Sequence, residues 1–153
     1  MNTRRPITPD AAPVLTLHVD IDATIPAVSD ERGTSVFIPI LGGLATGPDI
    51  SAEVLPGGGD WAVDRRSGEF VVHARYHLRT DDGAVIGVDN VGVWRERQGG
   101  SPYFVTTPRF TAPPGRYDWM NRAAFVGMAV ERGSERIDIE VYRLTPMVGT
   151  RFD

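Results

Sequence analysis

The chain contains neither cysteine nor lysine, and each absence excludes a class of chemistry. Without cysteine there are no disulfides, no thiol nucleophile and no thiolate ligands for a metal. Without lysine, a Schiff base with a carbonyl substrate and a Walker-type phosphate loop are both excluded. All 16 basic residues are arginines, scattered along a chain of net charge −4, which argues against nucleic acid as a partner.

Long apolar runs are absent as well. No stretch has the length and apolarity needed to span a bilayer, so we expect no membrane contact. No apolar segment follows the first residues, so we expect no secretory signal and a cytoplasmic protein. The length of 153 residues fits one domain with a substantial core. The polar, proline-containing residues 1–13 predict a flexible N-terminal arm before a single domain over residues 14–153.

What the sequence does contain is a strict alternation of apolar and polar residues, most clearly over residues 69–79. The apolar set is Phe70, Val72, Ala74, Tyr76 and Leu78. The residues between them are polar except for Val71, which is typical of a strand with one buried face. Asp82-Gly83 then predicts a tight turn, and residues 84–94 predict the second strand of a hairpin.

Similar short patterns recur along the chain between turns that contain glycine or proline. Further strands are predicted at residues 14–22, 34–41, 50–55, 60–65, 103–110, 125–131 and 137–145, with a loop at 23–33 and one helical turn within 117–124. About eight to ten short strands at this spacing indicate an all-β sandwich or barrel. Successive hairpins favour a single antiparallel up-and-down β-barrel, whose interior holds side chains or one small ligand.

Three glycines, Gly57 to Gly59, precede Asp60 and Trp61 at the start of a predicted strand. They lack the strand–helix context of a dinucleotide site. A carboxylate beside an indole has a raised pKa when the pair is desolvated, so we interpret Asp60 as a candidate general acid or base. The alternative is that Asp60 caps a turn and Trp61 belongs to the core.

Motifs spread over residues 14–145 resemble a known family. They are Gly42-Gly43, Leu55 to Trp61, Ala74-Arg75-Tyr76, Thr80 to Gly83, Asn90-x-Gly92, Tyr103-Phe104, Pro108-Arg109-Phe110 and Tyr117-x-Trp119-Met120-Asn121-Arg122. Together they are similar to the bacterial and fungal domain-of-unknown-function family 3237. The resemblance implies a single antiparallel β-barrel and says little about a reaction. The chain departs from the family pattern at Val105, where an arginine is expected at a candidate anion-binding position.

A set of polar and aromatic residues suits a pocket for a small, partly apolar molecule with an oxygen or carboxylate handle. The catalytic candidates are Asp60 and Tyr76, and the substrate-binding candidates are Trp61, Arg75, Asn90, Arg109, Tyr117, Trp119 and Asn121. Arginine binds carboxylates bidentately, while amides and a tyrosine hydroxyl stabilise a carbonyl or an enolate. Arg75 and Tyr76 are strand neighbours and point to opposite faces, so Arg75 points to solvent if the apolar face is the interior. The alternative role of Trp119 is to pack in the hydrophobic core.

Neither a metal nor another cofactor is expected. The three histidines are His18, His73 and His77, and Arg75 between the last two is a poor neighbour for a cation. No Gly-x-Ser-x-Gly elbow occurs, which disfavours a hydrolase of that class.

These features favour a cofactor-free enzyme, an isomerase, cyclase or lyase that acts by general acid–base catalysis on a small oxygenated metabolite bearing a carbonyl or carboxylate. The first alternative is a non-catalytic, lipocalin-like barrel that binds a small molecule. The second is a structural or assembly role through a sheet edge, which leaves a homo-oligomer open.

Overall fold

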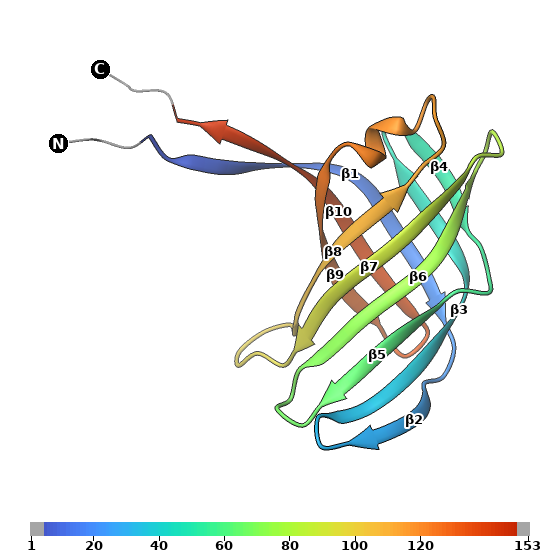
Figure 1. Ribbon diagram of the computed structural model, residues 1–153, viewed down its shortest axis with the longest axis vertical. Helices are drawn as coiled ribbons and strands as arrows, with labels where there is room; N and C mark the ends of the chain where they lie inside the picture. The colour runs from blue at the N-terminus through green and yellow to red at the C-terminus, as the bar shows by residue number, and fades with distance from the viewer. Residues whose placement is uncertain (1–4, 150–153) are drawn as a thin grey trace.

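Strands form nearly all of the regular structure in the computed structural model, which describes residues 5–149. The strands are β1 (Ile7–Ile21), β2 (Ile25–Asp30), β3 (Gly33–Gly47), β4 (Ile50–Val54), β5 (Gly59–Arg65), β6 (Phe70–Thr80), β7 (Val85–Arg95), β8 (Tyr103–Thr111), β9 (Ala124–Arg132) and β10 (Arg136–Val148). Within residues 5–149 the one helical element is the 3₁₀-helix η1 (Asp118–Asn121) (Figure 1). No helix in this part of the chain could cross a membrane.

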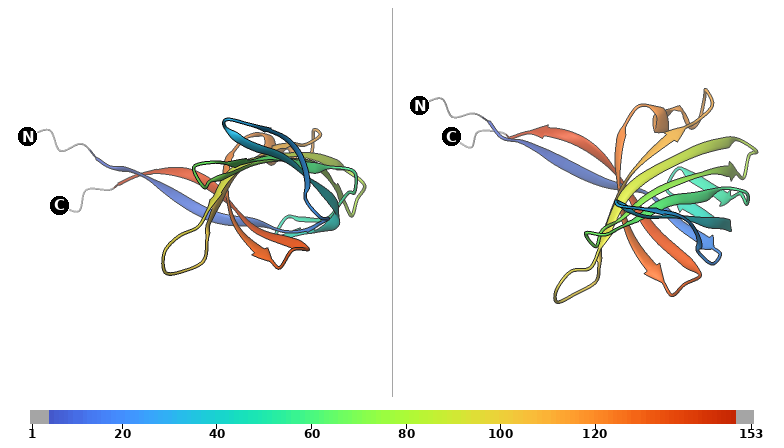
Figure 2. Two further views of the ribbon diagram at one scale, coloured as in Figure 1. Left: turned by 90° about the horizontal axis from the view of Figure 1, so that it is seen from below. Right: turned by 60° about the horizontal axis from the view of Figure 1, so that its bottom comes forward.

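The strands pair in a closed ring. Hydrogen-bonded neighbours run from β1 through β10, β9, β8 and β7 to β6. Strands β4 and β5 each pair with both β6 and β3, and β3 pairs back with β1. Every pairing is antiparallel, and β2 extends the ring as a hairpin partner of β3. From β6 to β10 the order around the ring follows the order along the chain. The predicted antiparallel up-and-down β-barrel is confirmed (Figure 2).

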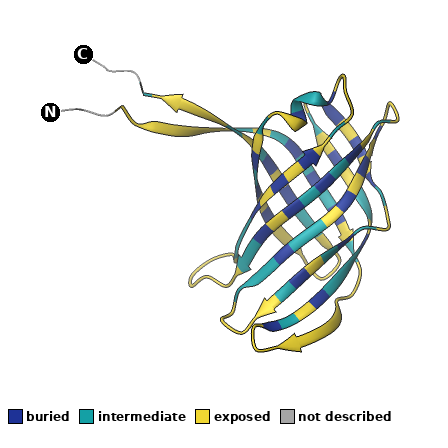
Figure 3. Cartoon of the chain, in the orientation of Figure 1, coloured by how far each residue is buried: buried dark blue, intermediate teal, exposed yellow. Residues whose placement is uncertain are grey.

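The central hairpin is confirmed as β6 and β7. Val72 pairs with Gly92 and Ala74 pairs with Asn90, so the alternation of the two strands stays in phase. Burial alternates along both strands, with the apolar parity facing the interior (Figure 3). Gly83 in the connecting turn takes a φ of 88°, a left-handed conformation that favours glycine.

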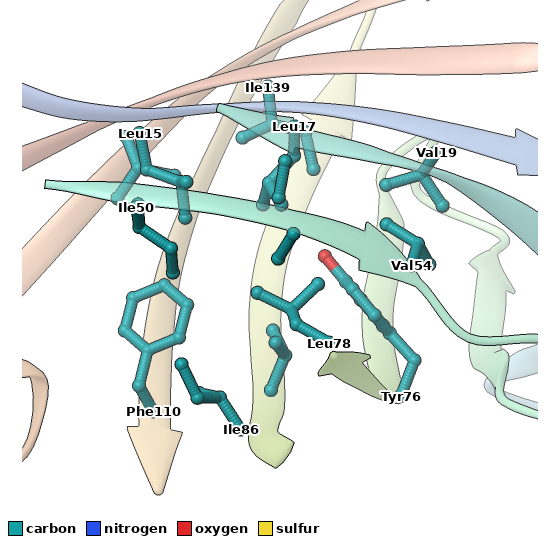
Figure 4. Packing of buried hydrophobic residues seen from close by; sticks show 14 of the residues in the cluster. Leu15, Leu17, Val19, Ile50, Val54, Tyr76, Leu78, Ile86, Phe110 and Ile139 are labelled. Carbon is teal, nitrogen blue, oxygen red and sulfur yellow. The ribbon is translucent and has the colours of Figure 1, made fainter. Parts of the chain in front are cut away.

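One end of the barrel, at η1, is packed with apolar side chains. The residues there include Leu15, Ile50, Ile86 and Phe110, which are labelled in Figure 4. Tyr117 and Met120 belong to the same cluster. The Tyr117 hydroxyl donates a hydrogen bond of 2.8 Å to Asp82 Oδ1, which ties the residues before η1 to the β6–β7 turn. Because this end is filled, any internal space must lie toward the other end.

Strand β3 continues beyond its predicted end at residue 41. A Cβ atom at Gly43 would lie 1.8 Å from the carbonyl oxygen of His18, so a glycine is needed for β1 to approach β3. Residues 25–30, predicted as part of a loop, form β2. All six are exposed, and without a buried face no alternation marks the strand in the sequence.

The predicted flexible arm covers residues 1–13. In the structure, residues 7–13 are the outer part of β1 and pair with residues 142–148 of β10. This two-stranded ribbon projects from the barrel (Figures 1 and 2). Most of its residues are exposed, so the sequence lacks the alternation of a half-buried strand there. Residues 1–4 lie outside the described residues.

Candidate functional site

A cavity of about 590 Å³ lies in the barrel beyond the packed end. Its wall consists of inward-facing side chains from several strands, and its rim includes residues 22–24 after β1 and the turn between β9 and β10. Most of the lining is apolar, for example Ile38, Ile40, Phe70, Val72, Phe104 and Ile137. This volume and this lining are typical of sites for small organic ligands.

Asp60 lies in the wall of this cavity. It pairs with Ile38 of β3 and with Ala74 of β6, both of which also line the cavity. Its Oδ1 atom accepts a hydrogen bond of 2.7 Å from the backbone N–H of His73. Burial raises the pKa of Asp60 to about 6, although this hydrogen bond and the nearby His73 side chain lower it. The carboxyl group therefore changes its protonation state close to neutral pH, as a general acid or base requires.

Four residues of the cavity lining each carry a buried polar side-chain atom without a hydrogen-bond partner. The atoms are Tyr76 Oη, Asn90 Oδ1, Trp94 Nε1 and Thr106 Oγ1. Among the described residues, these are the buried side-chain nitrogen and oxygen atoms that have no hydrogen-bond partner in the protein. Buried polar groups are normally paired, and an unpaired one costs free energy. Because these four residues line one cavity, this cavity is the candidate binding site.

The strand register explains why these groups meet. Asp60, Ala74 and Asn90 form one row across β5, β6 and β7. Gly92 and Thr106 form the next row, on β7 and β8. Since residues two apart on a strand share a face, these positions all point into the barrel.

Two glycines make room for Thr106. A Cβ atom at Gly92 would lie 2.5 Å from Thr106 Cγ2, and one at Gly127 would lie 2.3 Å from Thr106 Oγ1. Strand β9 pairs with β8 at Val105–Met128 and Thr106–Gly127. A larger residue at either glycine would fill the space that the threonine side chain occupies.

Tyr76 is almost completely buried, and its ring crosses the interior between Val19, Val54 and Leu78 (Figure 4). Burial raises the pKa of the Tyr76 hydroxyl above the usual tyrosine range, and the charge of Asp60 adds to this effect. The hydroxyl therefore stays protonated at any physiological pH. Tyr76 is suited to donate a hydrogen bond or a proton, while Asp60 is suited to accept one.

Comparison with known proteins assigns the chain to a family. The model of the family "Protein of unknown function (DUF3237)" matches residues 9–144. The chain belongs to the DUF3237 family. The resemblance seen in the sequence motifs is thereby confirmed.

Three relatives show how far the similarity extends. A UPF0311 protein of Rhodopseudomonas palustris is 39% identical over 129 residues, which cover 74% of this chain and 84% of the relative. Its crystal structure superposes with a TM-score of 0.85 at 32% identity, covering 90% and 99% of the two chains. A β-barrel-like protein of Acinetobacter baumannii gives a TM-score of 0.82 at 26% identity, covering 95% and 100%. An enzyme from Penicillium herquei gives 0.75 at 17% identity, covering 93% and 98%, a likeness of fold alone.

Of the site residues predicted from the sequence of this DUF3237 protein, the cavity brings together Asp60, Tyr76 and Asn90. Trp61 lies outside the barrel, where it is 53% exposed and packs against Phe37 with ring centroids 5.0 Å apart. Adjacent strand residues point to opposite faces, so the indole next to Asp60 in sequence is not the one that shares its cavity. Asp60 also bonds across to β6 rather than within the preceding glycine turn.

The two arginines predicted to bind a carboxylate also lie on the outer face. Arg75 is exposed, and its Nε atom lies 3.6 Å from Asp89 Oδ2. Arg109 is exposed opposite Asp89 on the neighbouring strand. The structure therefore does not bring either guanidinium group to the cavity, as the alternation argument for Arg75 anticipated.

The remaining three predicted residues belong to the packed end. Tyr117 is buried there, and Trp119 packs against Phe125 with ring centroids 6.2 Å apart. The Asn121 amide is exposed and forms hydrogen bonds of 2.8 and 2.9 Å with the backbone N–H and carbonyl of Ala112. Asn121 thus holds η1 against the residue that follows β8, and none of the three residues lines the cavity.

Trp94 and Thr106 line the cavity but were not predicted from the sequence. Trp94 shares the parity of Asn90 and Gly92, so extending that parity to the end of β7 would have found it. Thr106 has no distinctive motif around it, and only the pairing of β7 with β8 places it beside Gly92.

The histidines lie outside this cavity. His18 Nδ1 is 2.6 Å from Asp138 Oδ1, and His73 Nε2 is 3.0 Å from Asp89 Oδ1. Within residues 5–149, no group of three or more histidine, aspartate or glutamate side chains is placed to hold a metal ion.

Proposed function

We propose that this DUF3237 protein is a cofactor-free enzyme that moves a proton on a small oxygenated metabolite, in an isomerisation, cyclisation or elimination. The observation that carries the proposal is Asp60, a carboxylate set in an apolar cavity with a pKa of about 6. A general base works best when its pKa lies near the working pH. Tyr76, which stays protonated, lines the same cavity and supplies the complementary acid.

The proposed proton transfer uses the side chains already in place. Ionised Asp60 removes a proton from a C–H group next to a carbonyl, or from a hydroxyl group of the substrate. The negative charge that develops on the substrate oxygen is stabilised by the Tyr76 O–H and Trp94 N–H groups, whose polar atoms have no partner in the protein. In an isomerisation or cyclisation, Asp60 then returns the proton to another atom of the same molecule. In an elimination, it gives the proton to the departing group as the bond to that group breaks, so no co-reactant is consumed in any of the three reactions.

The second candidate function is a non-catalytic barrel that binds a small molecule. The mostly apolar lining of the cavity favours it, since such a lining binds ligands without any acid–base group. The Penicillium herquei protein is described as an enzyme, and its likeness supplies the fold but no residue role.

The test is hydrogen exchange at an activated C–H bond, because it needs no knowledge of the natural substrate. 2-Tetralone, an uncharged bicyclic ketone, is incubated in D₂O with the protein, and loss of its α-hydrogen signal is followed by NMR. We expect the wild-type protein to accelerate exchange and Asp60→Asn to lower the catalysed rate by about 10-fold or more, since an amide cannot accept the proton.

Asp64→Asn is the matched control, because Asp64 is exposed and lies on the same strand as Asp60. Its rate is expected to equal that of the wild type. If 2-tetralone binds but Asp60→Asn exchanges it as fast as the wild type, Asp60 is not the base and the non-catalytic binding function is favoured.

A further inference from the structure

The charged residues that line the cavity are all acidic. The charged side chains that line it are Asp22, Asp60 and Glu131, all carboxylates. Asp22 and Glu131 are exposed, and Asp60 is partly buried. No arginine in the described part of the chain lines it, although all 16 basic residues of the protein are arginines. A ligand in this cavity therefore meets negative charge without a compensating cation.

The arginines next to the cavity lining in sequence are engaged elsewhere. Arg132 and Arg136, which flank the β9–β10 turn at the rim, each place Nε 2.9 Å from a carboxylate oxygen of Asp138. Arg95, which follows Trp94, lies over the ring of Tyr103 with 4.7 Å between the guanidinium carbon and the ring centroid. These three guanidinium groups therefore interact with Asp138 or Tyr103 and not with the cavity.

A carboxylate ligand would be poorly accommodated here. It would lose its hydration on entering an apolar space, and it would face Asp60 as a like charge. In a medium of low polarity both effects are larger than in water, and a buried charge without a partner is strongly disfavoured. Anionic metabolites are thus selected against by the lining itself.

The unpaired polar atoms describe the ligand that does fit. Trp94 Nε1 carries a donor only, so it needs an acceptor such as a carbonyl oxygen, which an ammonium group lacks. Asn90 Oδ1 is an acceptor and needs a donor such as a hydroxyl group. The Tyr76 and Thr106 hydroxyls can serve in either role. Uncharged hydroxyl and carbonyl groups can therefore act as hydrogen-bond partners for these four atoms.

We propose that the cavity selects an uncharged, mostly apolar molecule that bears a hydroxyl or carbonyl oxygen, such as a phenol or ketone, and excludes carboxylates. The inference rests on the proposed function in taking this cavity as the substrate site. It narrows the substrate class, because the sequence had allowed a carboxylate held by Arg75 or Arg109.

The test compares three probes that share one ring system: uncharged 2-naphthol, the carboxylate 2-naphthoate and the ammonium form of 2-(aminomethyl)naphthalene. Dissociation constants are measured by equilibrium dialysis at neutral pH. We expect 2-naphthol to bind at least about 10-fold more tightly than 2-naphthoate, given the like-charge repulsion inside the cavity. Asp60→Asn, which removes the charge and keeps the shape, should reduce this discrimination, and Asp64→Asn should leave it unchanged.

NMR shows whether the probe binds in the cavity. The indole N–H signal of Trp94 should shift on addition of 2-naphthol, while that of exposed Trp61 should stay in place. The inference is overturned if 2-naphthoate binds as tightly as 2-naphthol, if the ammonium probe binds most tightly, or if no probe shifts the Trp94 signal. Because binding is read without turnover, a protein that prefers 2-naphthol but exchanges no 2-tetralone hydrogen keeps this inference and loses the proposed function.

Discussion

Asp60 on β5 and Tyr76 on β6 line one cavity, where burial and then the charge of the Asp60 carboxylate raise the pKa of Tyr76. Burial also raises the pKa of Asp60, to about 6. The two groups are therefore in different protonation states at neutral pH, with Asp60 mostly ionised and Tyr76 protonated. A pair with separated pKa values is the arrangement by which one site holds both a base and an acid.

The pH dependence of exchange follows from Asp60. The base is the ionised form, so the catalysed exchange of 2-tetralone should rise as pH increases through about 6 and then level off. No falling limb is expected at physiological pH, because Tyr76 remains protonated. Rates are measured by NMR from pH 4.5 to 8.5, and a catalysed rate that does not change between pH 5 and 7 would contradict this role.

Asp60→Asn should stabilise the protein at high pH. The pKa of Asp60 is raised from 3.8 to about 6 in the folded state, so the folded state holds the proton more tightly. The resulting contribution to stability is complete below pH 4 and is lost as pH rises through 6. At pH 8 we expect the variant to gain about 1–3 kcal/mol in the free energy of unfolding, with little gain at pH 4.

Urea unfolding at the two pH values measures this difference. Asp64→Asn serves again as the exposed control on the same strand and should show no such pH-dependent gain. A variant Asp60→Asn that is less stable than the wild type at pH 8 would show that the Asp60 carboxylate is stabilised by its surroundings instead.

Tyr76→Phe should separate stability from activity. The hydroxyl has no partner in the protein, so its removal should leave the free energy of unfolding unchanged or raise it by about 1 kcal/mol. The catalysed exchange should fall by about 10- to 100-fold, because the growing charge on the substrate oxygen loses a donor. Tyr103→Phe is the control, since Tyr103 packs with Arg95 and does not line the cavity. A stability loss with unchanged exchange would reverse the assignment.

Gly92→Ala should perturb the cavity through Thr106. The added methyl group would lie 2.5 Å from Thr106 Cγ2 and 2.6 Å from the carbonyl oxygen of Val105, so the backbone of β8 must shift. We expect a loss of about 1–3 kcal/mol in unfolding free energy. Gly87→Ala on the same strand is the matched control, because its methyl group would meet Thr111 at an ordinary 3.6 Å. Equal stabilities in thermal unfolding would refute the crowding at Gly92.

The barrel fold could be predicted because the alternation of apolar and polar residues marks the strands that have one buried face. Strands with one buried face, such as β6 and β7, show it clearly. Exposed β2 and the outer part of β1 carry no such signal, so they were predicted as a loop and an arm. Gly43 reads as a strand end in the sequence, whereas the structure uses it for the close approach of β1.

The site was predictable only in part, because it depends on which residues meet across strands. Asp60, Tyr76 and Asn90 were predicted by residue type, and Asp60 also by its place beside Trp61. Trp61 is adjacent to Asp60 in the chain, yet the strand pleat turns it to the outside, while Trp94 on β7 reaches the cavity. Register between strands is a property of the whole barrel and cannot be read from one segment.

The titration of Asp60 itself tests most directly whether this carboxyl group acts as an acid–base group. The carboxyl carbon of Asp60 is followed by ¹³C NMR between pH 3 and 9, with its signal assigned by its loss in Asp60→Asn. We expect a midpoint near 6, the value for a carboxyl group held in an apolar cavity. A midpoint in the ordinary aspartate range, close to 4, would mean that water solvates Asp60 freely, and it would contradict the acid–base site.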